Sequence, residues 1–419
     1  MQNMGKEKRI VINRNSILPM LIAIYVVFFS DSFYCTTMIP KVYEELFQWS
    51  LVVISILLFF RMILIQRKVG RDFFVLVFVI LTMLASMIVN SSPMGVYFYK
   101  IAVLLFGYCY SKLNNLDDFL NYFRKIMTFL MIVSLVFYIW YSIGLPVSFL
   151  PTVINNKGNS QYTILFATLP VVKGAFVRLK GPFWEPGVYA TYLTVALFFD
   201  LIIEKKKDLK YIILILVSLV LTFSTTGYFA AMIVIAGYVC EDSNNTSKTA
   251  KVLVVIGLLV TILLVLSSDS LYSFVFGKIE GNTESMKNRW NVISGNFEVI
   301  KRYPILGAGP AKSTHIIISN MKELGSRRSF SNLNTILANY SVFGVACAFY
   351  YLYFVLRFVK QASHNNLSRI LLLLSLVVLL SCFGFQFSLF YGIVFMLNST
   401  NTKDNVELNK SKYAQRMLV

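Results

Sequence analysis

Two clusters of basic side chains beside turn residues are the parts of this sequence that could support chemistry. The first runs from Arg178 to Gly187 and includes Lys180, Glu185 and Pro186. Guanidinium and ammonium groups bind phosphates, and a carboxylate beside them can take a proton from an attacking hydroxyl. Because Pro186 suits the first turn of a helix, two interpretations of Glu185 stay open: a helix cap or a general base.

The second cluster surrounds Arg289 and continues through residues 301–310, which include Arg302. The apolar residues between them recur at three- and four-residue spacing: Trp290, Ile293, Phe297 and Ile300. This spacing predicts an amphipathic helix at a membrane interface, with Arg289 near its start. The Gly307-x-Gly309 step lacks the third glycine, the strand and the helix of a dinucleotide site, and it predicts a tight turn.

The elements that must position these clusters are membrane helices. The chain has 419 residues, of which 57% are hydrophobic and 14% charged, whereas a soluble domain averages about 25% charged. The apolar residues gather near 17–39, 49–65, 73–89, 95–111, 126–145, 186–203, 211–226, 227–240, 252–268, 333–356 and 370–397. We expect a single all-α integral membrane domain over residues 1–419, with about 11 or 12 spans.

One polar step divides a long apolar stretch. Ser224-Thr225-Thr226-Gly227 lies between the runs 211–226 and 227–240. A polar turn at this depth is tolerated only where protein or a water-filled cavity satisfies its backbone groups. The sequence therefore predicts two short helices that meet at this turn.

Lysine and arginine accumulate in every second short loop, which predicts a multi-pass membrane protein with a cytoplasmic N-terminus. Two long segments, 146–185 and 269–332, then fall outside the cytoplasm, and the polar tail 398–419 falls inside. Both outer segments are basic. An outer excess of cations beside a membrane favours an anionic ligand such as a phosphate or diphosphate lipid head group.

Several classes of function are disfavoured. The net charge of +19 lies between membrane spans rather than on one soluble face, so a nucleic-acid partner is not expected. The five cysteines fall in or beside apolar runs without a CxxC pair, which predicts buried thiols. No His/Cys/Asp/Glu ligand set is visible, so we expect neither a metal nor a cofactor.

Four stretches recur in the order seen in a known family. They are Arg178-x-x-Gly181-x-Phe183-x-Glu185-Pro186-Gly187, Ser224-Thr225-Thr226-Gly227, Asn288-Arg289-Trp290, and Tyr303-Pro304-Ile305-Leu306-Gly307-Ala308-Gly309. As a set they resemble the bacterial O-antigen polymerase and O-antigen ligase superfamily, integral membrane glycosyltransferases with a large periplasmic loop late in the chain. The resemblance implies a fold of the glycosyltransferase C class and a polyprenyl-diphosphate glycan as donor.

The resemblance also implies roles for single residues. In the ligases, a loop histidine within a His-Asn-x-x-Leu stretch acts alongside two arginines. The two arginines carry over as Arg178 and Arg289, but the corresponding stretch here, residues 330–334, reads Phe-Ser-Asn-Leu-Asn and has no histidine. The base is then Glu185 or His315, and we favour Glu185. Further substrate-binding candidates are Lys180, Arg302, His315, Arg327, Arg328 and Asn332.

The missing histidine favours a polymerase of O-antigen or capsule repeat units. Its substrates would be undecaprenyl-diphosphate-linked oligosaccharides, joined outside the cytoplasm with inversion at the anomeric carbon. A chain-length regulator and a flippase of the same pathway are the partners expected. Three alternatives stay open: a ligase, a flippase or other transporter of lipid-linked oligosaccharide, and a structural membrane protein. A transporter should show two comparable halves and charges within its spans, and no half-repeat is visible.

Overall fold

A computed structural model of the chain describes residues 20–21, 23–25, 27, 41–65, 71–113, 116–154, 160–171, 177–204, 207–241, 284–324, 335–363 and 365–382. Its helices are α3 (Lys41–Ile65), α4 (Arg71–Val89), α5 (Met94–Leu113), α6 (Leu116–Ser142), α7 (Pro186–Phe198), α8 (Leu209–Leu221), α9 (Thr225–Val239), α12 (Glu284–Arg302), α13 (Gly309–Glu323), α14 (Thr335–Phe343), α15 (Val345–Ala362) and α16 (Asn366–Cys382). A π-helical segment, η2 (Phe199–Ile203), continues α7.

The fold is that of an all-α integral membrane protein, as predicted. Within the described residues, four helical stretches are long and apolar enough to cross a bilayer: Asp72–Val89, Met94–Leu113, Phe119–Ser142 and Pro186–Ile203. Large apolar side chains lie exposed along α4 and α6, among them Phe74, Phe78, Val136 and Ile139. Lipid accounts for such a surface, because soluble proteins rarely expose apolar patches of this extent.

The predicted number of spans stays a prediction. The apolar run 252–268 and most of the runs 17–39 and 370–397 lie outside the described residues. Shorter apolar helices occur at Trp49–Leu64, Leu209–Leu221, Thr225–Val239 and Asn366–Leu379. The run 333–356 contains a break, because α14 ends at Phe343 and α15 begins after Gly344.

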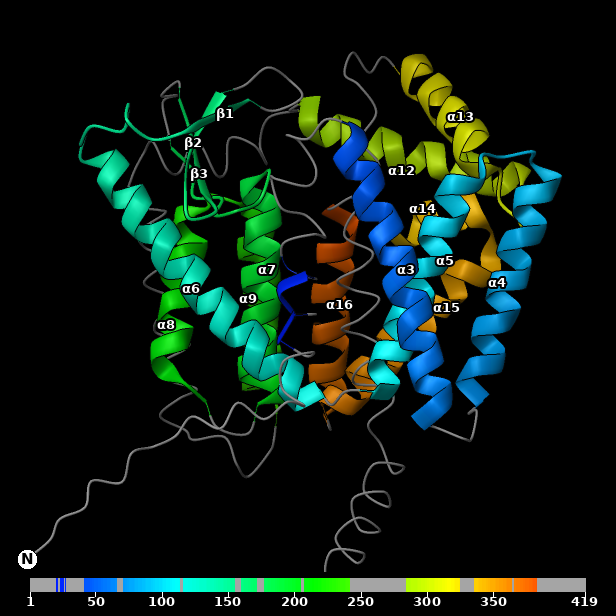
Figure 1. Ribbon diagram of the computed structural model, residues 1–419, viewed down its shortest axis with the longest axis horizontal. Helices are drawn as coiled ribbons and strands as arrows, with labels where there is room; N and C mark the ends of the chain where they lie inside the picture. The colour runs from blue at the N-terminus through cyan, green and yellow to red at the C-terminus, as the bar shows by residue number, and fades with distance from the viewer. Residues whose placement is uncertain are drawn as a thin grey trace, which may run out of the picture.

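One end of the bundle carries the elements that hold the candidate residues (Figure 1). A small sheet, the turn between α8 and α9, and the helices α12 and α13 gather there, and we call it the loop end. α12 lies across this end rather than along the bundle. The outer segment 269–332 contains the predicted helix as α12, and a second helix, α13, that packs on it.

A three-stranded sheet, not predicted from the sequence, lies at the loop end (Figure 1). Its strands β1 (Thr152–Ile154), β2 (Ser160–Ile164) and β3 (Ala167–Pro170) are antiparallel in the order β1-β2-β3. They lie inside the segment 146–185, which was expected only as a loop. The strands are short and rich in Thr, Val and Ile, and they are stable because Ala167 and Leu169 pack with Phe137 and Tyr141 of α6.

Candidate functional site

Arg178 joins the first basic cluster to the polar turn between α8 and α9. Its Nε donates to the carbonyl oxygen of Thr222 at 3.0 Å, and its Nη2 donates to that of Phe223 at 2.9 Å. One residue later, the backbone N–H of Leu179 donates to the carbonyl of Leu221 at 2.8 Å. The guanidinium thus satisfies carbonyls at the end of α8 that have no partner within that helix. Two motifs more than 40 residues apart form one structural unit.

The turn itself confirms the prediction that two short helices meet at Ser224. α8 ends at Leu221 and α9 begins at Thr225, and the Ser224 hydroxyl accepts a capping hydrogen bond from the Gly227 N–H at 3.3 Å. A Cβ on Gly227 would lie 2.5 Å from the Cβ of Ala190 in α7. Only glycine lets α7 and α9 approach this closely.

Arg178 is half-buried beside a carboxylate. Burial lowers the pKa of its guanidinium, whereas the negative charge of Glu185 nearby raises it. Arginine stays protonated under both influences, since its ordinary pKa lies far above neutrality. The site therefore combines a fixed positive charge with a carboxylate at the loop end.

Glu185 occupies the N-cap position of α7, with Pro186 following as the first helical residue. The predicted position at a helix start is confirmed. Its carboxylate is exposed and accepts no capping hydrogen bond from the helix. Capping therefore does not account for this side chain, and its use as a base stays a hypothesis.

Lys180 is buried, with 6% of its surface exposed. Its Nζ donates to the side-chain oxygen of Gln161 on β2, and burial lowers its pKa to about 7. Nearby, both the N–H and the hydroxyl of Thr168 on β3 donate to the carbonyl of Gly181, at 3.0 and 3.1 Å. These contacts fasten the segment that carries Arg178 to the sheet. Gln161 had no signal in the sequence that could have identified it.

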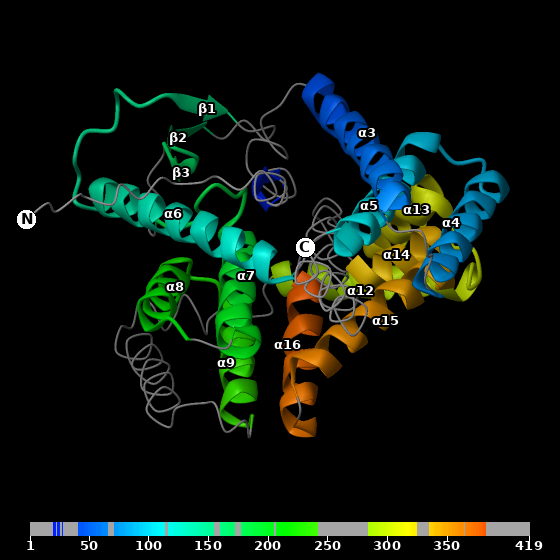
Figure 2. The same ribbon diagram turned by 60° about the horizontal axis from the view of Figure 1, so that its bottom comes forward.

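Arg289 lies on α12, and its side chain is outside the described atoms. In Figures 1 and 2, the amino end of α12 is the end of this helix that points toward α7. Trp290 and Phe297 are 70% and 58% exposed, whereas Val292 and Val299 pack against α13. The helix is therefore amphipathic as predicted, with its aromatic stripe facing outward.

The segment Tyr303–Gly309 is a structural turn, as predicted. The carbonyl of Ile305 accepts a hydrogen bond from the N–H of Val345 at 3.0 Å, and the N–H of Ala308 donates to the backbone carbonyl of Ser341 at 2.9 Å. Gly307 has φ +68°, and a Cβ there would lie 2.7 Å from the Val342 carbonyl. The turn thus anchors α12 and α13 to the junction between α14 and α15 through backbone atoms.

Side chains of α4 hold the same turn. Ser86 donates to the carbonyl of Leu306 at 2.6 Å, and Asn90 donates to that of Gly307 at 3.2 Å. Ser86 also contacts the hydroxyl of Tyr97 on α5 at 3.0 Å. Neither Ser86 nor Asn90 was a candidate in the sequence, because polar residues near a span end are common.

The other predicted substrate-binding residues are not brought together with Arg178 in the described structure. Arg302 is at the opposite end of α12 from Arg289 and pairs with Glu298 on the same helix at 2.9 Å. His315 is exposed on α13. Arg327, Arg328 and Asn332 lie outside the described residues.

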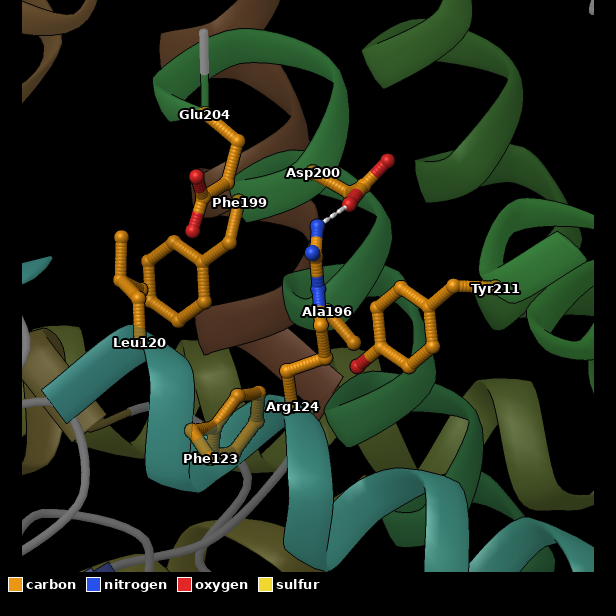
Figure 3. A pocket seen from close by; sticks show the side chains of 8 residues that line it. All are labelled: Leu120, Phe123, Arg124, Ala196, Phe199, Asp200, Glu204 and Tyr211. Carbon is orange, nitrogen blue, oxygen red and sulfur yellow. Dashed lines mark hydrogen bonds and ion pairs between the residues drawn. The ribbon is translucent and has the colours of Figure 1, made fainter. Parts of the chain in front are cut away.

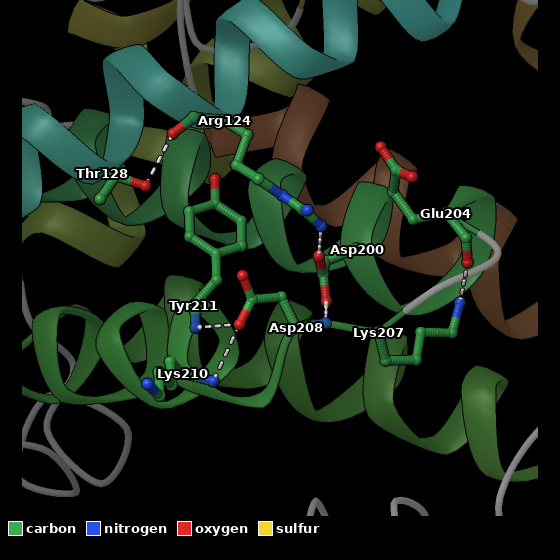
Figure 4. A network of polar contacts seen from close by, with 8 residues as sticks. All are labelled: Arg124, Thr128, Asp200, Glu204, Lys207, Asp208, Lys210 and Tyr211. Carbon is green, nitrogen blue, oxygen red and sulfur yellow. Dashed lines mark hydrogen bonds and ion pairs between the residues drawn. The ribbon is translucent and has the colours of Figure 1, made fainter. Parts of the chain in front are cut away.

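A second polar site lies at the end of the bundle opposite the loop end. Arg124 of α6 forms an ion pair with the buried side chain of Asp200 in η2. The Arg124 guanidinium also lies 5.1 Å from the centre of the Tyr211 ring (Figure 3). The Asp208 N–H also donates to Asp200 at 3.4 Å (Figure 4). A small cavity beside the pair is lined by Leu120, Phe123, Arg124, Ala196, Phe199, Asp200, Glu204 and Tyr211.

This second site is an attachment between helices. Lys207 donates to the carbonyl of Glu204, and burial lowers the pKa of Lys207. Opposite charges meet there across α6, η2 and α8, so the cluster fixes the ends of three helices. Among the described side chains, no three of His, Cys, Asp or Glu gather as a metal site would require.

Comparison with known proteins adds one finding. Residues 211–331 match the family model described as O-Antigen ligase. This segment is thus similar to the O-antigen ligase family over about 120 residues. The predicted resemblance to the O-antigen polymerase and ligase superfamily is thereby confirmed. No curated protein and no solved structure matches the chain.

The matched segment contains most of α8, all of α9, α12 and α13, and hence Arg289 and the turn at Gly307. Arg178 and Glu185 precede it in the chain. The hydrogen bonds from Arg178 to Thr222 and Phe223 join Arg178 directly to the matched segment. Members of the matched family are membrane glycosyltransferase-like enzymes.

Proposed function

We propose that the chain is a polymerase that joins oligosaccharide repeat units carried on undecaprenyl diphosphate. The proposal rests chiefly on Arg178, a guanidinium fixed at the α8–α9 turn beside the Glu185 carboxylate. The loop end then faces away from the cytoplasm at the inner membrane of a bacterium, and the N-terminus is cytoplasmic. The repeat units belong to an O-antigen or a capsule.

The reaction is a single displacement at the anomeric carbon of the donor. A hydroxyl oxygen on the terminal sugar of one lipid-linked unit bonds to that carbon, while its bond to the diphosphate oxygen breaks. The diphosphate leaves with the electron pair and remains on the lipid, and Glu185 takes the hydroxyl proton. Attack from the face opposite the leaving group inverts the centre.

Arg178 and Arg289 stabilise the charge that grows on the leaving diphosphate. A fixed cation in a water-poor setting costs no reorganisation during the reaction, and loss of such a group typically costs about 10² to 10³ in rate. Arg178 uses two of its N–H groups to hold its own position. Its contribution is therefore a charge whose place does not change. Lys180, buried against Gln161, supports this placement.

A ligase is the second candidate, because the matched family model is described as O-Antigen ligase. A ligase transfers finished glycan from the same lipid carrier to another acceptor. It would use the same diphosphate site, so the acceptor alone separates the two functions. The absence of histidine from residues 330–334 favours the polymerase.

The deciding experiment is a gel of surface polysaccharide from a strain that lacks the chain, with and without the gene restored. A polymerase predicts glycan with a single repeat unit in place of a ladder. Accumulation of completed lipid-linked polymer would assign the ligase function instead. Single-unit lipid trapped on the cytoplasmic side would overturn both and indicate a flippase.

A further inference from the structure

The turn that joins β2 to β3 has an unusual composition. Leu165 and Phe166 form a two-residue hairpin loop between the paired residues Ile164 and Ala167, and both have positive φ, 42° and 77°. Such loops usually contain Asn-Gly, because a side chain at positive φ is strained. Here both positions hold large apolar side chains, and these are 62% and 46% exposed.

Contacts along β3 fix the depth of this tip. At the far end of the strand, the Tyr141 hydroxyl donates to the Pro170 carbonyl at 2.7 Å. Two residues earlier, Thr168 donates to the carbonyl of Gly181. Gly181 in turn lies beside Ser134 of α6, because a Cβ added to this glycine would lie 3.3 Å from the Ser134 hydroxyl oxygen. Strand β3 therefore runs beside α6 from the level of Tyr141 to that of Ser134.

This direction leads into the membrane span of α6. Ser134 lies eight residues before the end of the span at Ser142, which is about 12 Å along a helix axis. The loop continues β3 past Thr168 and Ala167 in the same direction. Leu165 and Phe166 consequently lie at a depth that the span of α6 occupies in the bilayer.

The surface of α6 at this depth faces lipid. Its exposed side chains there are apolar, with Ile132 49%, Val136 58% and Ile139 55% exposed. We propose that the β2–β3 hairpin is a membrane-inserted element that places Leu165 and Phe166 in the hydrocarbon of the leaflet at the loop end, continuous with the lipid-facing surface of α6. Burial of two large apolar side chains in lipid offsets the strain of the turn.

The insertion has a consequence for the candidate site. The hairpin holds the Arg178 segment through Thr168 on Gly181 and through Gln161 on Lys180. An anchor in the leaflet therefore sets the height of the arginine relative to the lipid head groups. The inference concerns membrane contact alone, so it stands or falls separately from the proposed polymerase.

Site-specific quenching tests the insertion. Leu165→Cys and Phe166→Cys are made one at a time in the full-length chain after its five native cysteines are replaced by serine. Each is labelled with an environment-sensitive fluorophore and placed in lipid nanodiscs. Doxyl groups on the acyl chains quench labels within the bilayer, and iodide quenches labels in water.

Two matched sites calibrate the signal. Val136→Cys reports the lipid-facing side of α6, and Ser319→Cys reports an exposed polar position on α13. We expect doxyl lipid to quench the labels at positions 165 and 166 as strongly as the label at 136, and iodide to quench only the label at 319. Quenching of both hairpin labels by iodide, without quenching by doxyl lipid, would overturn the proposal.

Discussion

The guanidinium of Arg178 donates to the carbonyl oxygen of Phe223 at 2.9 Å, across 45 residues of sequence. This bond and its companion on Thr222 make the polar turn between α8 and α9 a support for the arginine. The side chain thus has two functions in the proposed mechanism. It fixes the turn, and it carries the charge that faces the diphosphate.

The two functions of Arg178 can be separated by substitution. Arg178→Ala should lower the polymerisation rate about 10²-fold or more, because both the charge and the support are lost. Arg178→Lys keeps the charge without the planar fork, and we expect most of the loss to persist. The measurement is polymer formed from purified lipid-linked repeat unit at equal protein, with Lys322→Ala on exposed α13 as control. Wild-type polymerisation by Arg178→Ala would contradict the proposed site.

Glu185→Gln tests the proposed base. The amide preserves the size of the side chain at the N-cap but cannot take a proton, so the rate should fall about 10²- to 10⁴-fold. Substrate binding should change little, because the arginines remain. Glu323→Gln, at an exposed position on α13, is the matched control. If Glu185→Gln polymerises like the wild type, Glu185 is not the base.

Lys180 should make stability depend on pH. Burial lowers its pKa to about 7 in the folded protein, whereas an unfolded lysine has a pKa of about 10.4. Between these values the unfolded state binds more protons, so this residue makes stability rise from pH 7 to pH 10. Below pH 7 both states are protonated and the full cost of the buried charge remains.

The measurement is the midpoint of thermal unfolding in detergent at several pH values. Lys180→Met should remove the part of the rise in stability that this lysine contributes. The plots of unfolding midpoint against pH for the variant and the wild type should therefore differ most in slope between pH 7 and pH 10. Equal slopes for the two proteins would show that Lys180 keeps an ordinary pKa. Lys322→Met, at an exposed position, should match the wild type.

Removal of the Arg124–Asp200 ion pair, at the end of the bundle opposite the loop end, should lower the stability of the protein. Asp200 is 1% exposed and its partner Arg124 is 28% exposed. Removal of one member of a buried pair costs about 3 to 5 kcal/mol, and the partial exposure of Arg124 places Asp200→Ala near the lower limit. Asp117→Ala, at an exposed position on α6, should have little effect. Chemical unfolding in detergent measures both, and equal stabilities would contradict a structural role for the pair.

The glycine between α14 and α15 should not tolerate a side chain. Gly344 has φ +92°, and an added Cβ would collide with the carbonyl of Ile305. Gly344→Ala should therefore displace the Tyr303–Gly309 turn and lower the yield of folded protein. Gly95→Ala in α5 is the control, because nothing lies within 4 Å of its Cβ position. Size-exclusion chromatography of both variants provides the measurement, and a wild-type profile for Gly344→Ala would refute the steric argument.

Much of the architecture follows from local sequence. Continuous apolar runs predicted the membrane helices, because the bilayer imposes their length. The polar step at Ser224 predicted a turn between two short helices, and Pro186 predicted a helix start through its missing N–H. The two glycines at 307 and 309 predicted the turn, since both have positive φ. These signals act over a few residues, and the sequence carries them directly.

The contacts of the candidate site could not be predicted in the same way. Arg178 binds backbone carbonyls of Thr222 and Phe223, which every residue type has, so their identity carries no signal. Gln161 meets Lys180 only because β2 packs beside the segment. Asp200 lies within an apolar run, and its partner Arg124 became evident only from the packing of α6 on η2. Long-range partners of this kind depend on the tertiary arrangement.

The attachment of α12 and α13 at the Tyr303–Gly309 turn has an implication for engineering. Backbone atoms of Ile305, Leu306, Gly307 and Ala308 make the hydrogen bonds that hold this turn. Such bonds survive most side-chain changes within the two helices. The pair α12–α13 should therefore be exchangeable as a unit between related chains, provided the graft keeps the glycines. Chimeras built in this way would show whether α12 and α13 determine which sugar the proposed polymerase extends.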